Sequence, residues 1–310
     1  MKKIVSVPCF NEEDTIEMTL NTLLDYSSTL DNSFDILIVN DGSNDKTEKI
    51  LTKFKDQVEI LNSSLNFGLV EVFNSIINYS LEHNYDQLVI FDADLQYPYD
   101  EIEKLFLELS QQNADIVIGV REFKKINHFS NIKKLLQILG SKIVSFLVGY
   151  KISDVTSGFR SYNLKRINDL ICIGSFTYTL ESLFVAKKYN LSIGTMKISY
   201  INETRESRLF KTNFDYIKKT LAQIIEVLIF HTRIVKRSIL LSAIPGFYLI
   251  SRFLFKYIME GSNSGNIQSL VVGMNLLIIV LVLFVSLYIV TFLKNLKYEN
   301  YIKFYSRKHF

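Results

Sequence analysis

The sequence predicts an α/β domain, with a mainly parallel sheet and helices on both of its faces, followed by a transmembrane hairpin of two helices. Short apolar runs alternate with helical patterns along residues 1–120, and a polar cluster follows four of those runs. Two long uncharged stretches lie in the last part of the chain. Strands buried on both faces have continuous apolar runs, and about 20 apolar residues cross a bilayer as a helix.

The apolar runs are expected as the strands of the sheet. They are IVSVP (4–8), FDILIVND (34–41), VEILN (58–62), QLVIFDAD (87–94) and DIVIG (115–119). Helices are expected between these strands, and the helix after the fourth strand begins at Pro98. Farther along, residues 128–150 and 178–188 are expected as helices and residues 194–201 as a strand. In such a sheet, ligands bind beyond the carboxyl ends of the strands.

Polar clusters follow the first four strands at that edge. They are PCFNEE (8–13), NDGS (40–43), NFG (66–68) and DAD (92–94). Asp92 and Asp94 are two residues apart, so in a strand they point to the same side. A solvated turn is the plain alternative, because Asp and Pro are common turn residues. Four clusters at one edge favour a binding site, and the paired carboxylates favour a bound cation.

Composition and motifs exclude several classes of function. The net charge of +3 is small and no basic, aromatic-interleaved tract is present, so nucleic acid is not expected as a partner. Neither GxGxxG nor GxxxxGK[ST] occurs, which argues against a dinucleotide fold and a P-loop NTPase. The two cysteines, Cys9 and Cys172, fit a reducing compartment and have no metal-binding spacing.

Two segments near the carboxyl end are expected to cross a membrane. Residues 267–293 carry no charge, and residues 238–251 are uncharged too, with Arg252 and Lys256 interrupting the apolar residues that follow. Lysines and arginines flank the hairpin on both sides. By the positive-inside tendency, the catalytic domain and both termini are expected in the cytoplasm, with the chain multi-pass in the inner (cytoplasmic) membrane.

These segments divide the chain into expected parts. The parts are a catalytic domain (1–212), an amphipathic juxtamembrane helix (213–237), two transmembrane helices (238–293) and a basic cytoplasmic tail (294–310). Apolar residues of the juxtamembrane helix recur at helical spacing. It is expected to lie on the bilayer surface, to pack on the catalytic domain, or both.

Six motifs together resemble those of a known family. PCFNEEDTI, VNDGSNDKT, NFGL, FDADLQYP, DVTSGFR and TRESRL, in this order and spacing, resemble the inverting glycosyltransferases of family 2, which have the GT-A fold. With the hairpin, the chain is most similar to polyprenyl-phosphate glycosyltransferases, the dolichyl-phosphate mannose synthase and GtrB-like group. The resemblance covers nearly the whole chain. It implies a Rossmann-like sheet, a UDP- or GDP-linked sugar donor, a polyprenyl phosphate acceptor and Mg²⁺ or Mn²⁺ as cofactor.

The resemblance also implies roles for individual residues. The donor pocket would contain Pro8, Phe10, Asn11, Glu12, Val39, Asp41, Asn66, Asp92, Ala93, Arg205 and Arg208. The metal would be held by Asp94 and Gln96, with Asp92 beside them. The catalytic set would be Asp94, Arg121, Asp154, Arg160 and Glu181, and the acceptor phosphate would meet Arg121, Lys134 and Ser141.

One motif departs from the family pattern. Relatives usually carry R-x-x-G-E-S-K, whereas NETRESRL is one residue shorter and lacks the glycine. Arg205 and Arg208 are the residues matched to the loop that closes over the diphosphate.

Plainer interpretations remain for three of these residues. Arg121 would be a solvated arginine, Arg160 would pair with Asp154 to hold its loop, and Glu181 would be an exposed helical residue. A lipid or glycan hydroxyl acceptor is the alternative reaction, and it would require a carboxylate base such as Asp154 or Glu181.

Other classes are less well supported. A non-catalytic membrane interaction module would not need the carboxylates of the DAD motif, which are present. A processive synthase would carry QxxRW, and the chain has no Trp. The sequence does not determine the oligomeric state, and it is compatible with a homo-oligomer.

Overall fold

The computed structural model describes residues 1–123, 126, 131–167, 170–174, 177–199, 213–231, 234–261 and 267–307. The chain forms two compact units, Met1–Gln223 and Ile224–Phe310.

The first unit contains a seven-stranded sheet with the strand order β3-β2-β1-β4-β6-β5-β7. The strands are β1 (Lys3–Cys9), β2 (Asp35–Asn40), β3 (Glu59–Asn62), β4 (Gln87–Ile90), β5 (Ile116–Arg121), β6 (Arg160–Asn163) and β7 (Ile193–Ile198). All neighbouring pairs are parallel except the two that involve β6. The mainly parallel sheet predicted from the apolar runs is confirmed. Strand β6 was not expected.

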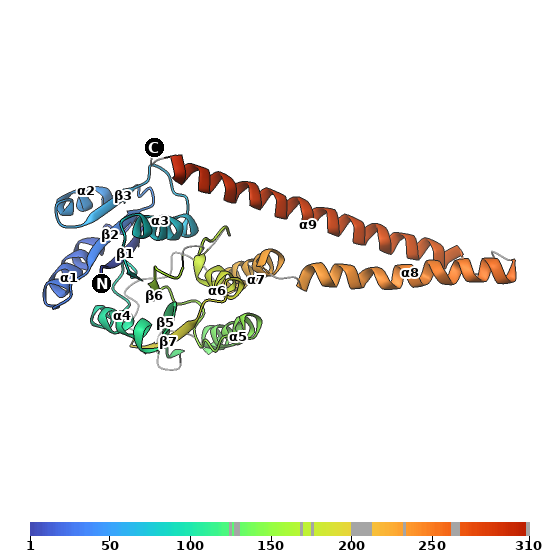
Figure 1. Ribbon diagram of the computed structural model, residues 1–310, viewed down its shortest axis with the longest axis horizontal. Coiled ribbons are helices and arrows are strands. Elements are labelled where there is room, and N and C mark those ends of the chain that lie inside the picture. Colours follow the sequence, from blue (N-terminus) through green and yellow to red (C-terminus); the bar gives the residue numbers. More distant parts are fainter. Residues whose placement is uncertain are drawn as a thin grey trace. The chain divides into compact units, whose positions relative to one another are not determined.

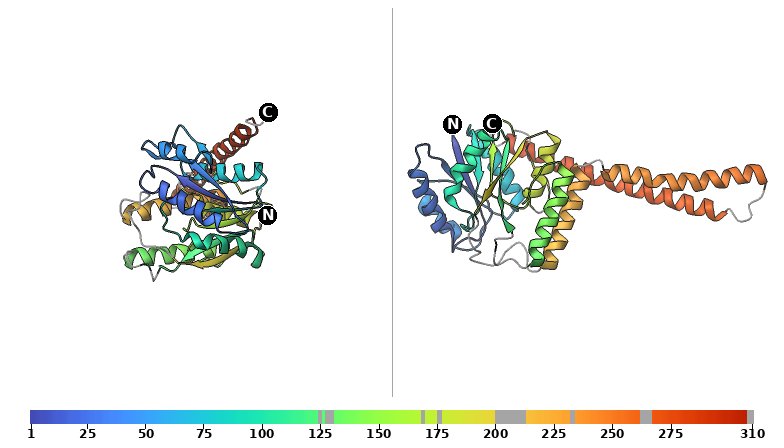
Figure 2. Two further views of the ribbon diagram at one scale, coloured as in Figure 1. Left: turned by 90° about the vertical axis from the view of Figure 1, so that its left-hand side faces the viewer. Right: turned by 90° about the horizontal axis from the view of Figure 1, so that it is seen from below.

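Helices cover both faces of this sheet (Figures 1 and 2). In chain order they are α1 (Ile16–Ser28), α2 (Thr47–Leu51), η1 (Thr52–Phe54), α3 (Leu69–Glu82), η2 (Tyr99–Glu101), α4 (Ile102–Gln111), α5 (Asn131–Val148), α6 (Tyr178–Lys188) and the start of α7 (Asn213–His231). The expected helices after Pro98 and at 128–150 and 178–188 are therefore present.

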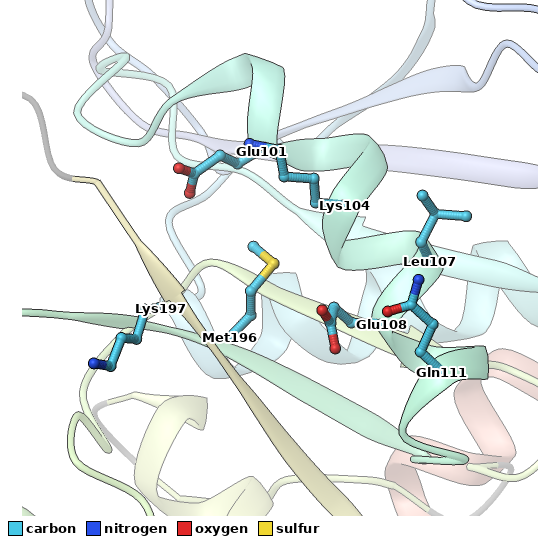
Figure 3. A pocket seen from close by; sticks show the side chains of 7 residues that line it. All are labelled: Glu101, Lys104, Leu107, Glu108, Gln111, Met196 and Lys197. Carbon is cyan, nitrogen blue, oxygen red and sulfur yellow. The ribbon is translucent and has the colours of Figure 1, made fainter.

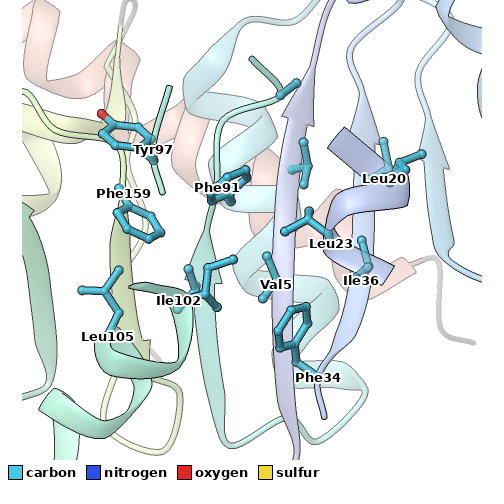
Figure 4. Packing of buried hydrophobic residues seen from close by; sticks show 14 of the residues in the cluster. Val5, Leu20, Leu23, Phe34, Ile36, Phe91, Tyr97, Ile102, Leu105 and Phe159 are labelled. Carbon is cyan, nitrogen blue, oxygen red and sulfur yellow. The ribbon is translucent and has the colours of Figure 1, made fainter. Parts of the chain in front are cut away.

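The main core lies between the sheet and helices α1 and α4 (Figure 4). Leu20 and Leu23 of α1 and Leu105 of α4 are fully or almost fully buried against strand residues such as Val5. On the other face, Phe73 of α3 stacks on Tyr178 of α6, with ring centroids 4.3 Å apart. Because both faces of the sheet are covered by apolar side chains, the strands have continuous apolar sequences without alternating polar residues.

The sheet reverses its direction of growth at β1 and β4. β2 and β3 add on one side of β1, and β4 adds on the other. The carboxyl ends of β1 and β4 therefore lie at a switch point, where parallel sheets bind their ligands. The segments that follow these two strands are Phe10–Glu13 and Phe91–Gln96.

The second unit contains two long helices, α8 (Ile234–Glu260) and α9 (Ile267–Arg307). Residues 237–259 and 267–293 are long and apolar enough to cross a membrane, judged by length and composition. A Cβ at Gly246 of α8 would lie 3.1 Å from the Gly273 carbonyl oxygen of α9, so the two backbones approach closely through small residues. Two apolar helices that could form the expected hairpin are present, and α9 stays helical to Arg307, well into the predicted basic tail.

Candidate active site

The loops after β1 and β2 are tied together by hydrogen bonds. The Asn11 N–H donates to Ser43 Oγ at 2.9 Å, and the Asn44 N–H donates to Asn11 Oδ1 at 2.9 Å. Asn11 has a positive φ of 57°, which an asparagine tolerates. Ser43 Oγ in turn donates to Asn40 Oδ1 at 2.6 Å. Two of the predicted polar clusters thus form one rigid loop pair.

Asp41 links this pair to the third cluster. Its two carboxylate oxygens accept the N–H groups of Phe67 at 2.8 Å and Gly68 at 2.9 Å, just before α3. The approach is close, because a Cβ at Gly42 (φ +67°) would lie 2.5 Å from the Leu65 carbonyl carbon. Asp41 therefore shapes the loop that contains Asn66, and its predicted contact with the base and ribose stays a prediction.

The first-strand wall contains the other predicted donor residues. Pro8 pairs with Val39 across β1 and β2, and Phe10 is 39% exposed beyond them. Glu12 is mostly buried; its backbone N–H donates to Thr47 Oγ1 at 2.8 Å, and its Oε2 accepts from Thr15 at 3.0 Å. Glu12 thus stabilises the turn into α1.

The DAD segment follows β4 at the switch point. Asp92, Asp94 and Gln96 are each half-buried, whereas Ala93 is buried and its carbonyl accepts from Thr19 Oγ1 at 2.7 Å. Asp94 Oδ1 accepts the Gln96 N–H at 3.2 Å, with Leu95 at φ 55° between them. The segment therefore presents two carboxylates and an amide side chain within five residues.

This donor set suits a hard divalent cation, which prefers oxygen ligands. A glycine faces it: a Cβ at Gly158 would lie 3.4 Å from Asp92 Oδ1 and 3.5 Å from Oδ2. Because Gly158 has no side chain, the space beside the Asp92 carboxylate stays open on that side. Among the described residues, no group of three or more His, Cys, Asp and Glu side chains is arranged to hold a metal by itself.

Arg121, at the end of β5, is paired with Asp154. Its Nε donates to Asp154 Oδ2 at 2.6 Å and one Nη to Oδ1 at 3.2 Å. The Arg121 side chain is 11% exposed and Asp154 is fully buried, so the interpretation of Arg121 as solvated is wrong. The same Nη donates to Thr156 Oγ1 at 3.0 Å, and Thr156 donates to Gln137 of α5 at 3.1 Å.

Arg160 is fully buried at the start of β6. Its guanidinium donates to the carbonyls of Ser157 at 2.8 Å and Val155 at 2.9 Å, and to Ser182 Oγ at 2.9 Å. The alternative in which Arg160 pairs with Asp154 is therefore wrong, because Arg121 is that partner. Arg160 holds the backbone of the DVTSGFR loop, and its predicted catalytic role stays a prediction.

Glu181 is buried in α6, with 1% of its surface exposed, so the exposed alternative is wrong. Its carboxylate accepts the N–H groups of Ile173 at 3.0 Å and Gly174 at 2.7 Å. A Cβ at Gly174 would lie 2.6 Å from Glu181 Oε2, so a larger residue there would force the carboxylate to move. The carboxylate holds the loop before α6.

The predicted acceptor residues of α5 differ in exposure. Lys134 is half-buried, whereas Ser141 is 2% exposed and accepts the Val155 N–H at 3.4 Å. Ser141 thus supports the loop that contains Asp154. Arg205 and Arg208 lie outside the described residues.

Two tyrosines near the DAD segment were not singled out from the sequence. The Gly158 N–H donates to the Tyr97 hydroxyl at 3.3 Å, and the Tyr178 hydroxyl donates to the Gly158 carbonyl at 3.2 Å. Both tyrosines are buried. The one sequence signal was the position of Tyr97 directly after Gln96.

Buried tyrosines predict a loss of stability in alkali. Burial raises the pKa of Tyr162 and Tyr178 well above the ordinary value near 10. Above pH 10 the unfolded chain loses protons that the folded chain keeps, so stability falls by about 1.4 kcal/mol per pH unit for each such group. We expect the melting temperature of the purified protein to fall between pH 10 and 11.5.

Tyr162→Phe provides the control for that prediction. It removes one titrating group on the opposite sheet face from the main core, and should reduce the slope of melting temperature against pH. An identical slope for the variant and the parent would contradict the assignment.

A pocket of about 240 Å³ lies elsewhere, at the outer side of α4 and the edge strand β7 (Figure 3). Its lining is formed by Glu101, Lys104, Leu107, Glu108, Gln111, Met196 and Lys197. None of these residues is in the predicted site. The candidate site rests on the strand ends, where the carboxylates and Arg121 lie.

Two curated relatives resemble this chain over most of their own length. The chain is 28% identical over 216 residues to the UDP-N-acetylglucosamine–dolichyl-phosphate N-acetylglucosaminyltransferase of Methanococcus voltae, covering 63% of this chain and 84% of that protein. It is 26% identical over 219 residues to the undecaprenyl-phosphate mannosyltransferase of Micrococcus luteus, covering 67% of this chain and 88% of that protein.

Solved structures resemble the chain in fold. Glucosyl-3-phosphoglycerate synthase of Mycobacterium tuberculosis, in complex with UDP, aligns with a TM-score of 0.55 and 15% identity, covering 74% of this chain and 79% of that chain. Another structure of that enzyme contains Mn²⁺ and UDP. This similarity confirms the GT-A fold. The family model described as glycosyl transferase family 2 matches residues 4–171, more than half of the chain, and the chain belongs to this family.

Proposed function

We propose that this chain is a membrane-anchored glycosyltransferase that moves a sugar from a UDP- or GDP-linked donor to a polyprenyl phosphate, with inversion at the anomeric carbon. The product is a polyprenyl-phosphate-linked sugar. The proposal is supported by relatives named as dolichyl-phosphate and undecaprenyl-phosphate sugar transferases. The two apolar helices of the second unit support a lipid acceptor.

The observation that carries the proposal is the state of the two candidate bases. Asp154 is fully buried and paired with Arg121, and Glu181 is buried with both oxygens accepting backbone N–H groups. A hydroxyl acceptor needs a carboxylate that can take its proton. A phosphate monoester is already anionic at neutral pH and needs no such base. Because both candidate bases are already bound to other groups of the protein, a phosphate acceptor is favoured over a hydroxyl acceptor.

The chain's own residues would act by binding and orientation. The loop pair after β1 and β2, stiffened by Asn11 and Asp41, would hold the nucleotide. Arg121 would orient the acceptor phosphate, because a guanidinium matches phosphate geometry. Positioning the two substrates for in-line displacement removes much of the entropic barrier.

A divalent cation, Mg²⁺ or Mn²⁺, is the proposed cofactor. Asp94 and Gln96 would hold it, with Asp92 beside them, and the oxygen-rich donor set fits such an ion. The bound ion would neutralise charge that develops on the departing nucleoside diphosphate. The M. tuberculosis relative in fold has been crystallised with Mn²⁺ and with Mg²⁺.

The bilayer is the proposed location, with the catalytic unit on the cytoplasmic side. Lysines and arginines flank the two apolar helices, which supports cytoplasmic termini. Helix α5 adds a second lipid contact. One of its faces exposes apolar residues of which Phe146 is the most exposed, at 86%, and the others are Ile132, Leu135, Leu139 and Ile143. Such a face, with Lys142 beside it, suits the interface of an anionic membrane.

Label transfer in membranes tests the proposal. Membranes containing the protein would be incubated with a panel of radiolabelled UDP- and GDP-sugars, and the lipid extract would then be counted. We expect one sugar to enter the lipid fraction in a form that mild acid releases, as a sugar phosphodiester does. An acid-stable product would favour the hydroxyl acceptor, and an unlabelled lipid fraction would contradict both.

A further inference from the structure

The segment 154–158 is held in place from several sides. Arg160 binds the carbonyls of Val155 and Ser157, and Arg121 binds the carboxylate of Asp154. The backbone of Gly158 is bound at both polar groups, since its N–H donates to Tyr97 and its carbonyl accepts from Tyr178. We call residues 154–158 the Asp154 segment.

Tyr97 lies directly after the DAD segment in the sequence and is hydrogen-bonded to the Asp154 segment. It follows Asp94 by three residues and Gln96 by one. Its ring is stacked on Phe159, with centroids 5.1 Å apart and planes at 19°, so the hydroxyl has little freedom. Tyr97 is buried, and Figure 4 shows its ring beside that of Phe159. The Tyr97 hydroxyl therefore joins a residue directly after the DAD segment to the backbone of the Asp154 segment.

We propose that Tyr97 is a positioning residue: by accepting the Gly158 N–H, it sets the distance between the DAD segment and the Asp154 segment that carries the Arg121 pair. This inference rests on the proposed function, in which the DAD segment serves the donor and Arg121 the acceptor. A transfer between two substrates depends on their mutual distance, and a misplacement of about 1 Å can cost a hundredfold in rate.

Tyr97→Phe tests the proposal, because phenylalanine keeps the stacked ring and removes the acceptor oxygen. The purified full-length protein would be assayed with undecaprenyl phosphate and the labelled nucleotide sugar that gives a lipid product. We expect kcat to fall roughly tenfold or more while the donor KM stays within about twofold, the pattern of a lost transition-state interaction. An unchanged kcat, or a loss confined to donor KM, would overturn the proposal.

Two further variants make the result specific. Tyr85→Phe is the matched control, since Tyr85 is also buried and donates to Asp35 at 2.7 Å, at the opposite, amino-terminal edge of β2. It should leave kcat unchanged. Tyr178→Phe removes the second bond to Gly158, and its effect should not add fully to that of Tyr97→Phe, because both hydroxyls hold the backbone of the same residue.

Hydrogen exchange separates this inference from the function on which it rests. We expect faster amide exchange in peptides covering residues 155–160 of Tyr97→Phe, and parental exchange there in Tyr85→Phe. A parent protein that labels no lipid would refute the proposed function alone. Exchange at 155–160 that is unaltered in Tyr97→Phe would refute the role of Tyr97, whatever the substrate.

Discussion

Asp94→Ala is expected to lower sugar transfer by about a hundred- to a thousandfold, the scale seen when a group that stabilises developing charge is removed. Asp94 is half-buried at the switch point, and its Oδ1 also orients Gln96 through the backbone. The variant loses a proposed metal ligand and that local bond together. Initial rates of label transfer, measured over a titration of Mn²⁺, would report the loss.

Asp94→Asn and Asp100→Ala accompany that variant. The asparagine keeps the shape and the bond to Gln96 but removes the charge, and it should also fail to transfer. Asp100 is exposed in η2, six residues farther along the chain, so Asp100→Ala should retain parental rates. An Asp94→Ala protein with full activity would eliminate the assignment of the metal to this segment.

Arg121→Met is expected to reduce both stability and transfer. It leaves the fully buried carboxylate of Asp154 without its cation, and breaking a buried pair on one side costs about 3–5 kcal/mol. Thermal unfolding of the detergent-solubilised protein would measure the first effect. Transfer is expected to fall below detection, because Arg121 is the proposed acceptor ligand.

A double variant separates the two effects. Arg121→Met combined with Asp154→Leu removes both charges, and replacing a buried pair by apolar residues is often neutral or stabilising. We expect its melting temperature to recover while transfer stays absent. Recovery of transfer in the double variant would mean that the pair only stabilises the fold. Arg121→Lys, which loses the bidentate geometry, should raise the acceptor KM and leave the donor KM unchanged.

The parallel half of the sheet and the hairpin were predictable because their signals are local. Continuous apolar runs identify β1, β2 and β4 as buried strands, and an uncharged stretch identifies α9. The gathering of polar loops at one edge follows from parallel strand direction alone. Strand β6 has no such signal, since RSYN is short and mixed, and it exists because it pairs antiparallel with both β4 and β5.

The partners of charged side chains were not predictable, because they depend on contacts distant in sequence. Arg121 and Asp154 meet because the chain returns through β6 beside β5. Arg160 and Glu181 were expected in the site because they match positions of the family motifs, and full burial was not foreseen, since arginine and glutamate are seldom fully buried. Each is buried because backbone groups satisfy it: carbonyls of the Asp154 segment for Arg160, and N–H groups of residues 173 and 174 for Glu181.

We expect a phosphate, and no hydroxyl, to accept the sugar. The most direct test gives the purified protein undecaprenyl phosphate and undecaprenol in parallel, with the same nucleotide sugar and Mn²⁺. The masses of the lipid products are then measured by mass spectrometry. We expect a product heavier than undecaprenyl phosphate by one sugar residue, and no product from undecaprenol. Glycosylated undecaprenol, with undecaprenyl phosphate unchanged, would contradict the account.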